Sequence, residues 1–355
     1  MTPGGDVPVL GIKDVALAAG VSQATASRAL SGRGSVSPKT RARVQAAAAD
    51  LGFQISYHAS SLATGRSRNI GVVLPYVNRW YFSTVLEGLT RPLIDAGYDL
   101  TLYDFQGDLH RRTVLDDFLL RKRLDGVITV GLRLNEADTT RFLSLDIPVV
   151  SIGGSLPGIA SLTIDEHAIG RLAADHLIGL GHTRVAHIGG EHESNLYFHV
   201  SWDRREGYRA AMEAAGLEQR SAWSVISDYT VNSAYEVAKS LLADPHNRPT
   251  AICCASDEMA IGAILAARDL GLHIPEQLSV IGVDKHPLGV VFGLTTIDQF
   301  VEEQGTRAAH TLLDELAETH EGRRGTLPSL TELPITIVTR SSTASPTKNK
   351  NPTFH

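Results

Sequence analysis

The chain has few of the features that mark exported, cross-linked or membrane proteins. Its 355 residues include only two cysteines, Cys253 and Cys254, which are adjacent. Adjacent residues of a strand point to opposite faces, so we expect two buried thiols in a reduced compartment rather than a disulfide or a metal site. No apolar run approaches the ~18 residues needed to cross a bilayer, and the N-terminus has no basic start followed by an apolar block. A cytoplasmic protein without membrane contact is therefore expected.

The sequence also lacks the familiar motifs of catalysis. It holds no GxSxG, no phosphate-binding P-loop, no GxGxxG after a strand and no convincing nucleophile–base pair. The glycine-containing stretches GGSLPG and SGRGS have low specificity. We therefore expect no catalytic residue, no cofactor and no bound metal, although an enzyme on a doubly wound fold remains an alternative.

Charge is distributed unevenly along the chain. The formal net charge of −6 by itself argues against a nucleic-acid binder. Residues 1–66, however, carry seven Lys or Arg against three Asp, a net +4, which leaves −10 for the remainder. A small basic head on a large acidic body predicts that only the head meets a polyanion.

The first 55 residues predict three short helices. The stretch IKDVALAA has apolar residues at helical spacing, and Gly20 after it can take a left-handed cap. Ser22 can cap a second helix, from Gln23 to Leu30. The third opens with Ser and Pro in SPKTRARVQAAAADLGF and stops at Gly52. The short turn between the first two helices is typical of a helix-turn-helix.

The second of these helices, within VSQATASRALSG, has few large apolar side chains. Four residues suffice to seat it on its neighbours: Val21, Ala26, Ala29 and Leu30. The residues left outside are Gln23, Ala24, Thr25, Ser27 and Arg28. Small side chains let a helix enter a major groove, Gln and Arg reach base edges, and Ser and Thr suit phosphates. A short solvated helix in an ordinary bundle remains the alternative.

From Ile70 onward, strands and helices alternate, which predicts a parallel, doubly wound α/β architecture. The strand candidates are NIGVVLP, YDLTLYD, DGVITVG, IPVVSIGG, RVAHIGG, AWSVIS, TAICCAS and LSVIGVD. The helical candidates include 83–96, 109–122, 166–180, 204–215, 231–243, 257–270 and 300–317. The α/β region that begins at Ile70 is long for a single sheet, which favours two lobes. The polar end, 342–355, is predicted to be a disordered tail.

Seven stretches in order resemble one family. The stretch IKDVALAAGVSQATASRALSGRGSVSPKTRARVQAAAADLGF resembles the DNA-binding signature of the lactose-repressor/galactose-repressor (LacI/GalR) transcription regulators. Six more are similar to that family's hinge and periplasmic-binding-protein-like core: SLATGRSRNIGVVLP, LGHTRVAHIGG, RREGYRAAM, PTAICCASDEMAIGAI, GLHIPEQLSVIGVD and LTTIDQ. The resemblance covers nearly the whole chain.

The resemblance implies a domain order. It places a helix-turn-helix head at 1–55, a hinge at 56–68 and a type I periplasmic-binding-protein-like core at 69–341. Within the core we expect lobe 1 at about 69–165 and 296–322, and lobe 2 at about 166–295 and 323–341.

The resemblance also implies roles in DNA binding. Gln23, Ala24 and Arg28 fall on positions that meet bases, and Leu62 falls on a hinge leucine that wedges into the minor groove. Three residues fall near backbone phosphates: Ser22, Thr25 and Ser27. Ser31, at the end of the same stretch, is also expected to contact DNA. The hinge departs from the family pattern, with Ile55-Ser56 in place of a frequent Pro-Asn pair and Ser60 in place of an arginine. Leu62 as a core contact is the alternative.

The core positions that match the family's effector site are Tyr81, Phe82, Arg204, Tyr229, Ser256 and Asp284. Arg204 falls on an effector-binding arginine, and Asp284 leaves a strand where crevice ligands sit. A donating arginine with an accepting aspartate suits a sugar-like or purine-like ligand. The alternatives are an ion pair of Arg204 with Glu206 or Asp203, a strand-end cap for Asp284, and ordinary packing for the three aromatic residues.

The loop 191–202, EHESNLYFHVSW, is longer than the family's usual connection. It lies just before Arg204, so it can shape an unusual pocket. Its histidines, His192 and His199, have a spacing that matches no common metal site.

Together these observations predict an effector-controlled DNA-binding regulator, most simply a repressor. A homodimer would read a pseudo-palindromic operator, and a small sugar-like effector in the cleft would control affinity. The alternative is a solute-binding protein of sugar transport with the same core fold. The basic head and the missing export signal count against it.

Overall fold

The computed structural model describes residues 10–31, 35–53, 66–105, 107–118, 124–132, 134–190, 200–320 and 330–347. The chain divides into two compact units, Met1–Arg68 and Asn69–His355. We call them the head and the core.

The head contains three helices around a small apolar centre. They are α1 (Ile12–Ala18), α2 (Gln23–Ser31) and α3 (Pro38–Asp50). Gly20, after α1, has φ +60°, the left-handed conformation that the sequence predicts there. Ser37 caps α3 by accepting a hydrogen bond from the Thr40 amide at 3.2 Å. The most buried apolar residues are Val15, Ala26, Ala29 and Val44, one to two from each helix, which confirms the predicted helix-turn-helix packing.

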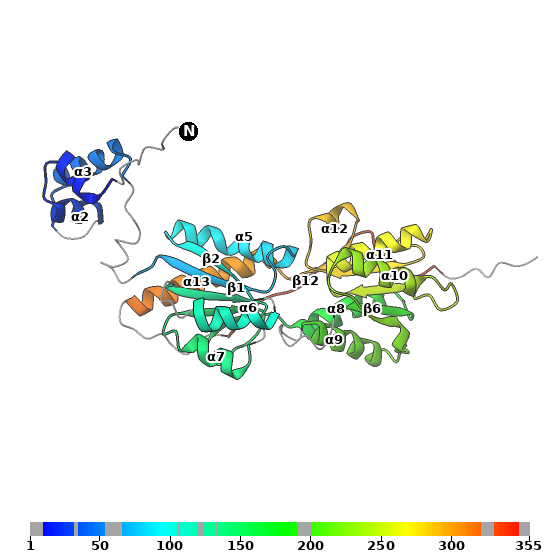
Figure 1. Cartoon of the computed structure of the whole chain (residues 1–355). Coiled ribbons are helices and arrows are strands. Elements are labelled where there is room, and N and C mark those ends of the chain that lie inside the picture. Colours follow the sequence, from blue (N-terminus) through cyan, green and yellow to red (C-terminus); the bar gives the residue numbers. More distant parts are fainter. Residues whose placement is uncertain are drawn as a thin grey trace, which may run out of the picture. The chain divides into compact units, whose positions relative to one another are not determined.

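The core consists of two lobes, each built on a six-stranded sheet (Figure 1). The lobe 1 sheet is parallel, in the order β11-β5-β4-β3-β1-β2, and the lobe 2 sheet has the order β12-β10-β9-β8-β6-β7, with only β12 antiparallel. The strands of lobe 1 are β1 (Asn69–Leu74), β2 (Asp99–Asp104), β3 (Gly126–Val130), β4 (Val149–Ile152), β5 (Ala160–Thr163) and β11 (Leu330–Glu332). Those of lobe 2 are β6 (Val185–Gly189), β7 (Ser224–Ile226), β8 (Ala251–Cys254), β9 (Ser279–Val283), β10 (Thr295–Asp298) and β12 (Thr336–Val338).

Helices cover both faces of each sheet, as a doubly wound fold requires (Figure 1). In lobe 1, α5 (Trp80–Asp95) and α13 (Val301–His320) share one apolar cluster, and α6 (Gly107–Thr113), a π-helical turn (Val114–Phe118) and α7 (Glu136–Leu143) lie on the other face. In lobe 2, α10 (Val231–Leu242) and α11 (Asp257–Asp269) oppose α8 (Glu166–Gly179) and α9 (Val200–Ala214). The short elements are a 3-10 turn (Ser221–Trp223) and α12 (Leu288–Val291).

Each of the eight predicted strands is present, and each predicted helix overlaps an observed one. The sequence did not predict four of the described strands, β5, β10, β11 and β12, or the helices α7 and α12. Two of these strands, ASLT and TTID, are short and half Ser or Thr, and the other two, LTE and TIV, have only three residues each. Thr295 and Thr296 are fully buried, which a strand search based on apolar runs does not detect.

The chain crosses between the lobes three times, and the predicted lobe boundaries were wrong at two of the crossings. Strand β10 (Thr295–Asp298) pairs with β9, so residues 296–298 belong to lobe 2 rather than lobe 1. Strand β11 (Leu330–Glu332) pairs with β5, so it belongs to lobe 1 rather than lobe 2. Pairing between strands far apart in sequence decides both assignments.

The predicted disordered tail begins too early. Ser342 is 1% exposed, and its backbone bonds Gly293 and Val280 at 2.8 and 2.9 Å. The Ala344 carbonyl lies 2.8 Å from His182 Nε2. These bonds satisfy polar groups of lobe 2 that would otherwise be buried without partners, so residues 342–347 are part of the lobe.

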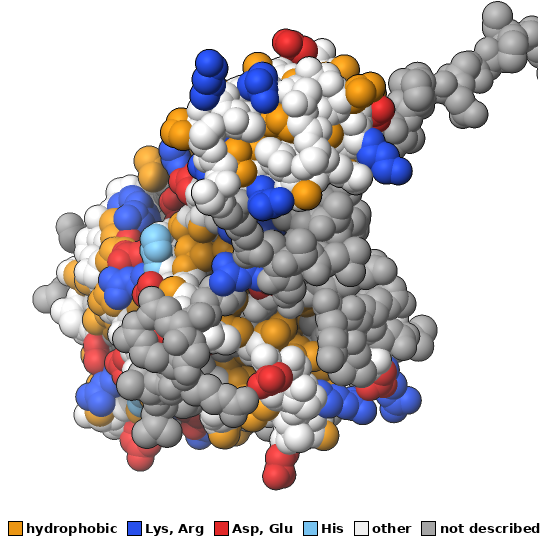
Figure 2. All heavy atoms as spheres, turned by 90° about the vertical axis from the view of Figure 1, so that its left-hand side faces the viewer, with side chains coloured by type: hydrophobic (Ala, Val, Ile, Leu, Met, Phe, Trp, Pro, Cys, Tyr) orange, Lys and Arg blue, Asp and Glu red, His pale blue; other side chains and the backbone are white. Residues whose placement is uncertain are grey.

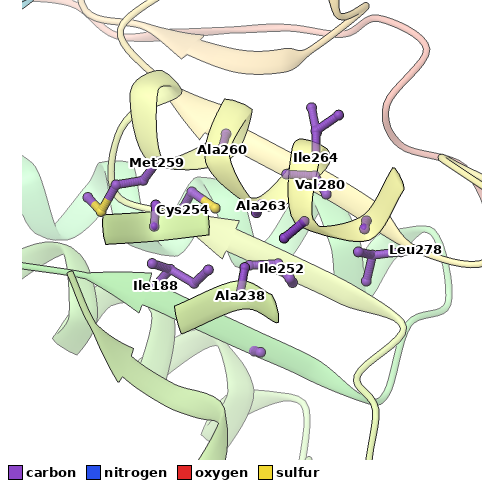
Figure 3. Packing of buried hydrophobic residues seen from close by; sticks show 14 of the residues in the cluster. Ile188, Ala238, Ile252, Cys254, Met259, Ala260, Ala263, Ile264, Leu278 and Val280 are labelled. Atoms are coloured by element: carbon purple, nitrogen blue, oxygen red, sulfur yellow. The ribbon is translucent and has the colours of Figure 1, made fainter. Parts of the chain in front are cut away.

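The adjacent cysteines point to opposite faces of β8, as expected. Cys253 packs in the cluster beneath α8 and α9, whereas Cys254 packs with Met259 and Ile188 in the cluster of Figure 3. Both are buried and free. Burial raises the pKa of each thiol, which keeps both in the neutral form.

Candidate functional site

The outer face of α2 is small and polar. Gln23, Ala24, Ser27 and Arg28 are exposed, as the sequence predicts, and the Arg28 Nε donates to the Ala24 carbonyl at 3.1 Å. Thr25 is half-buried instead of outside. Figure 2 shows basic side chains standing out on the head's surface.

Two of the predicted phosphate contacts form the cap of α2. Ser22 Oγ accepts from the Thr25 amide at 3.1 Å, and the two hydroxyls lie 2.8 Å apart. The bonds hold the start of the helix, with Gln23 and Ala24 in its first turn. Ser31 ends α2, and Leu62 lies outside the described residues.

A cavity of about 530 Å³ lies in the core, and both lobes line it. All six residues that the sequence predicts for an effector site are among its lining. Lobe 1 contributes Tyr76, Arg79, Tyr81, Phe82, Gly131 and Gly153, and Gln299 lies on a crossing between the lobes. Lobe 2 contributes Glu166, Val200, Ser201, Trp202, Arg204, Ile226, Ser227, Asp228, Tyr229, Ser233, Ser256, Glu258 and Asp284. The volume of the cavity is in the range typical of small-molecule binding sites.

Arg204 is held rigidly at this cavity. Its Nε donates to Glu166 at 2.6 Å, and its Nη1 donates to the Ala255 carbonyl. Burial by itself would lower the pKa of the guanidinium, but the charges of Glu166 and Asp284 outweigh burial and raise it. Arg204 is therefore a permanent cation that is 4% exposed.

Helix α9, which carries Arg204, packs so closely against α8 that no side chain fits between the two backbones at the crossing. A Cβ added to Gly170 of α8 would lie 1.8 Å from the Arg204 carbonyl oxygen, and one at Gly207 would lie 2.0 Å from the His167 carbonyl oxygen. Two glycines thus allow the helices to approach, and this approach brings Arg204 to Glu166 at the start of α8.

Asp284 follows β9 at the carboxyl edge of the lobe 2 sheet. It has φ +117°, and its Oδ1 accepts a hydrogen bond from Gln299 Nε2. Burial raises the pKa of this carboxyl to about 7, since the nearby Arg204 charge offsets only part of the cost of burying it. Asp284 is therefore divided between its two protonation states near neutral pH.

The aromatic side chains line the cavity with their rings, and the hydroxyls of the two tyrosines form hydrogen bonds within the protein. Tyr81 donates to Gln304 Oε1 at 2.8 Å, and the hydroxyl of Tyr229 lies 2.7 Å from Ser201 Oγ. Phe82 meets Tyr81 edge to face with ring centroids 5.2 Å apart. Ring faces held in this way can cover the apolar side of a ligand.

Two contacts join the lobes beside the cavity. Arg79, before α5 of lobe 1, donates to the Asp228 carbonyl of lobe 2 at 2.8 Å. The rings of Trp80 and His286 lie 4.8 Å apart, again one from each lobe. A change in the angle between the lobes would break both contacts.

Within the described ranges, no group of three or more His, Cys, Asp or Glu side chains could hold a metal ion. His192 and His199 lie outside those ranges. No helix in the described parts of the chain is long and apolar enough to span a membrane.

Comparison with known proteins gives the family. Residues 11–56 match the model of bacterial regulatory proteins of the lacI family, and 174–343 match a periplasmic binding protein-like domain. The HTH-type transcriptional repressor PurR of Serratia proteamaculans (strain 568) is 33% identical over 316 residues, 87% of this chain and 91% of that protein. PurR of Yersinia enterocolitica is 32% identical over 343 residues, 94% of this chain and 96% of that protein.

The chain belongs to the LacI family. It is a DNA-binding repressor with a ligand-binding core.

Solved structures of LacI-family proteins agree with this architecture. The lac repressor dimer bound to operator and the anti-inducer ONPF matches with a TM-score of 0.79 and 25% identity, over 94% of this chain and 99% of that one. The complex of the regulator CelR with cellobiose matches with a TM-score of 0.68 and 26% identity, over the same shares.

Inside this LacI-family core, the structure gives partners for two of the predicted site residues, Arg204 and Ser256. Arg204 pairs with Glu166, whereas Glu206 pairs with Arg205 at 3.7 Å and Arg209 at 3.3 Å. Ser256 both lines the cavity and caps α11, because its Oγ accepts from the Met259 amide at 3.2 Å. Its hydroxyl hydrogen remains able to donate to a ligand.

Sequence reasoning missed several polar residues of the cavity, among them Glu166, Glu258, Gln299 and Arg79. Gln299 is the last residue of LTTIDQ, a stretch that resembles the family. The resemblance therefore marked this position, but the sequence alone did not predict that Gln299 lines the cavity. Glu166 follows β5, which was not predicted, and only the fold places it beside Arg204.

Proposed function

We propose that the ligand of this LacI-family repressor is a small, polar, sugar-like effector that binds between the lobes and changes operator affinity. The observation that carries the proposal is the buried Arg204, which is held by Glu166 and the Ala255 carbonyl in a cavity lined by both lobes. A ligand there touches both lobes, so its affinity depends on the angle between them. Operator and effector must then change each other's affinity reciprocally.

The proposed roles in effector binding follow from the chemistry of the side chains. Arg204 donates to ligand oxygens, and Asp284 accepts from ligand hydroxyls. Ser256 donates its hydroxyl hydrogen, and the rings of Tyr81, Phe82 and Tyr229 cover apolar faces of the ligand.

The proposed DNA contacts lie on the head and hinge. Gln23, Ala24 and Arg28 read bases in the major groove, because their exposed side chains lie on one face of α2. The proposed phosphate contacts are Ser22, Thr25, Ser27 and Ser31. Leu62 is proposed as a minor-groove wedge from the family resemblance alone.

A homodimer on a pseudo-palindromic operator is the proposed assembly. Three neighbouring aliphatic side chains on α12, Leu288, Val290 and Val291, are 52%, 66% and 78% exposed in the single chain. An apolar patch of this kind is typical of a protein interface, and the lac repressor that this chain resembles is a dimer. We propose that a second copy covers it.

We propose a cytoplasmic location and no enzymatic activity. Operator DNA as the partner supports the location, and the groups around the cavity support binding rather than chemistry: Arg204 is a fixed cation and Tyr81 and Tyr229 hold raised pKa values because of burial.

The alternative raised from the sequence, a solute-binding protein of sugar transport, shares the core fold but is not consistent with membership of the LacI family of repressors. The head counts against it, because the exposed face of α2 has no use in transport.

The experiment that tests the proposal uses the full-length protein. DNA fragments bound from the genome define an operator, and metabolites suggested by the neighbouring genes are then titrated against the complex. We expect one of them to change operator affinity at least fivefold. The variant Arg204→Ala should still bind operator but lose this response, whereas Arg209→Ala, an exposed control on the same helix, should keep it. An unchanged response of Arg204→Ala to the same ligand concentration would contradict the site.

A further inference from the structure

The cavity holds more acidic than basic side chains. Glu166, Asp228, Glu258 and Asp284 line it, against Arg79 and Arg204. Arg204 is matched by Glu166 in the ion pair at 2.6 Å. An excess of carboxylates therefore remains for a ligand to meet.

Most side-chain donors around the cavity are already used by the protein. Arg79 donates to the Asp228 carbonyl, and its guanidinium lies 3.9 Å from the centre of the Tyr76 ring. Gln299 donates to Asp284, and Tyr81 donates to Gln304. A ligand thus meets side-chain donors that are largely engaged, and carboxylates that each keep some capacity to accept, although Glu166, Asp228 and Asp284 already accept from Arg204, Thr230 and Gln299.

Glu258 is the clearest of these acceptors. It lies in the first turn of α11, half-buried, and lines the cavity. Among the described residues it has no hydrogen bond and no ion pair. Burial raises the pKa of its carboxyl, and the charge of Arg79 offsets only part of this effect. The carboxyl is thus partly desolvated without a partner, which costs free energy unless a ligand supplies one.

A second polar group at the cavity is also unsatisfied. Ser227 is 4% exposed and lines the cavity, and its Oγ, which is itself fully buried, has no partner among the described residues. The backbone carbonyl of Asp228, the next residue, accepts from Arg79, whose charge also acts on Glu258. Ser227 and Glu258 therefore belong to the same end of the cavity, around Arg79, and of the two it is the half-buried Glu258 carboxyl that a ligand can reach.

We propose that the effector carries a protonated amine, as in an amino sugar or a comparable polyhydroxylated amine, and that Glu258 is the residue that selects it. The inference rests on the proposed function, because it specifies the ligand of that same cavity. The ammonium donates to Glu258 at the end of the cavity around Arg79. The hydroxyls at the other end meet Arg204 and Asp284.

The charge of the cavity discriminates between anionic, neutral and cationic ligands more sharply than its shape does. An anionic ligand, such as a sugar acid or a sugar phosphate, would add negative charge beside the four carboxyl groups that line the cavity, and among the lining side chains only Arg204 and Arg79 would oppose it. A neutral sugar can donate to the Glu258 carboxylate through a hydroxyl. An ammonium makes a similar hydrogen bond and adds the attraction between two opposite full charges, which is strengthened where the carboxylate is partly desolvated.

The test uses matched ligands and full-length protein. Glucosamine, galactosamine and mannosamine are each compared with the parent hexose and with the corresponding uronic acid. Affinity is measured from the tryptophan fluorescence of the protein, whose tryptophans, Trp80, Trp202 and Trp223, all lie in the core. We expect at least one amino sugar to bind about tenfold or more tightly than its parent, and its uronic acid not to bind at the same concentration.

Two variants decide whether Glu258 is responsible. Glu258→Gln keeps the size and one acceptor oxygen but removes the charge, so the preference for the amino sugar should fall to about twofold or less. Glu236→Gln, an exposed control on α10, should keep the preference. A binding-competent Glu258→Gln protein that retained the full preference would overturn the role of Glu258.

The panel also separates this inference from the proposed function. Equal or tighter binding of a parent hexose, or binding of a uronic acid, would overturn the amine and leave the sugar-like effector standing. Binding of no member of the panel would overturn both the amino-sugar effector and the sugar-like ligand of the proposed function.

Discussion

Replacing Asp284 with asparagine should remove a pH dependence from the stability of the core. Asp284 is 7% exposed, and burial raises the pKa of its carboxyl from 3.8 to about 7. Between these values the folded protein holds a proton that the unfolded chain has released. The free energy of unfolding therefore falls as pH rises through this window.

The size of the effect follows from the shift. A shift of about three pH units at ~1.4 kcal/mol each gives roughly 4 kcal/mol in total, of which about 2–3 kcal/mol falls between pH 5 and pH 8. Asparagine keeps the shape and an acceptor for Gln299 but cannot ionise. Relative to wild type, Asp284→Asn should thus gain about 2–3 kcal/mol of stability on going from pH 5 to pH 8.

Urea unfolding followed by tryptophan fluorescence measures this difference, because all three tryptophans lie in the core. Glu213→Gln on α9 is the matched control, since Glu213 is exposed. Stability curves for wild type and Asp284→Asn that run parallel from pH 5 to pH 8 would refute the assignment of a raised pKa to Asp284.

Three further outcomes are expected. Arg28→Ala should cost about 1–3 kcal/mol of operator affinity and relax base specificity, as measured by competition with random DNA; equal loss on both DNAs would make Arg28 a phosphate contact. Gly170→Ala should force α8 away from the Arg204 carbonyl, lower stability to urea by about 1–3 kcal/mol and weaken effector binding, whereas Gly179→Ala on the same helix meets no atom within 4 Å and should do neither. Val291→Glu should shift sedimentation from dimer to monomer; an unchanged dimer would place the interface away from α12.

Local features of the fold were predictable because their causes are local. Ser22 and Ser37 cap helices through bonds to residues three positions away, and Gly20 ends α1 through its own backbone. Strands with continuous apolar runs, such as β1 and β3, were also recognised. The short strands β5 and β10 escaped because their buried residues include Ser and Thr, whose burial depends on neighbouring strands.

The cavity was predictable only in part. The family-like stretches pointed to Arg204 and Asp284, and the structure brings both to one cavity. The partners that decide their charge, Glu166 and Gln299, are 38 and 15 residues away in sequence. A pKa depends on burial and on neighbouring charge, and neither can be read from the residues beside the group.

The sequence by itself determined the helix-turn-helix, the small outward face of α2, the alternation of strands and helices, and the family. Each of these depends on residue type and on spacing within a single element. Only the tertiary structure decided which lobe holds β10 and β11, that residues 342–347 complete lobe 2, and that Glu258 faces the cavity with no partner among the described residues. These depend on which distant segments meet, because hydrogen bonds and desolvation act between groups that are close in space.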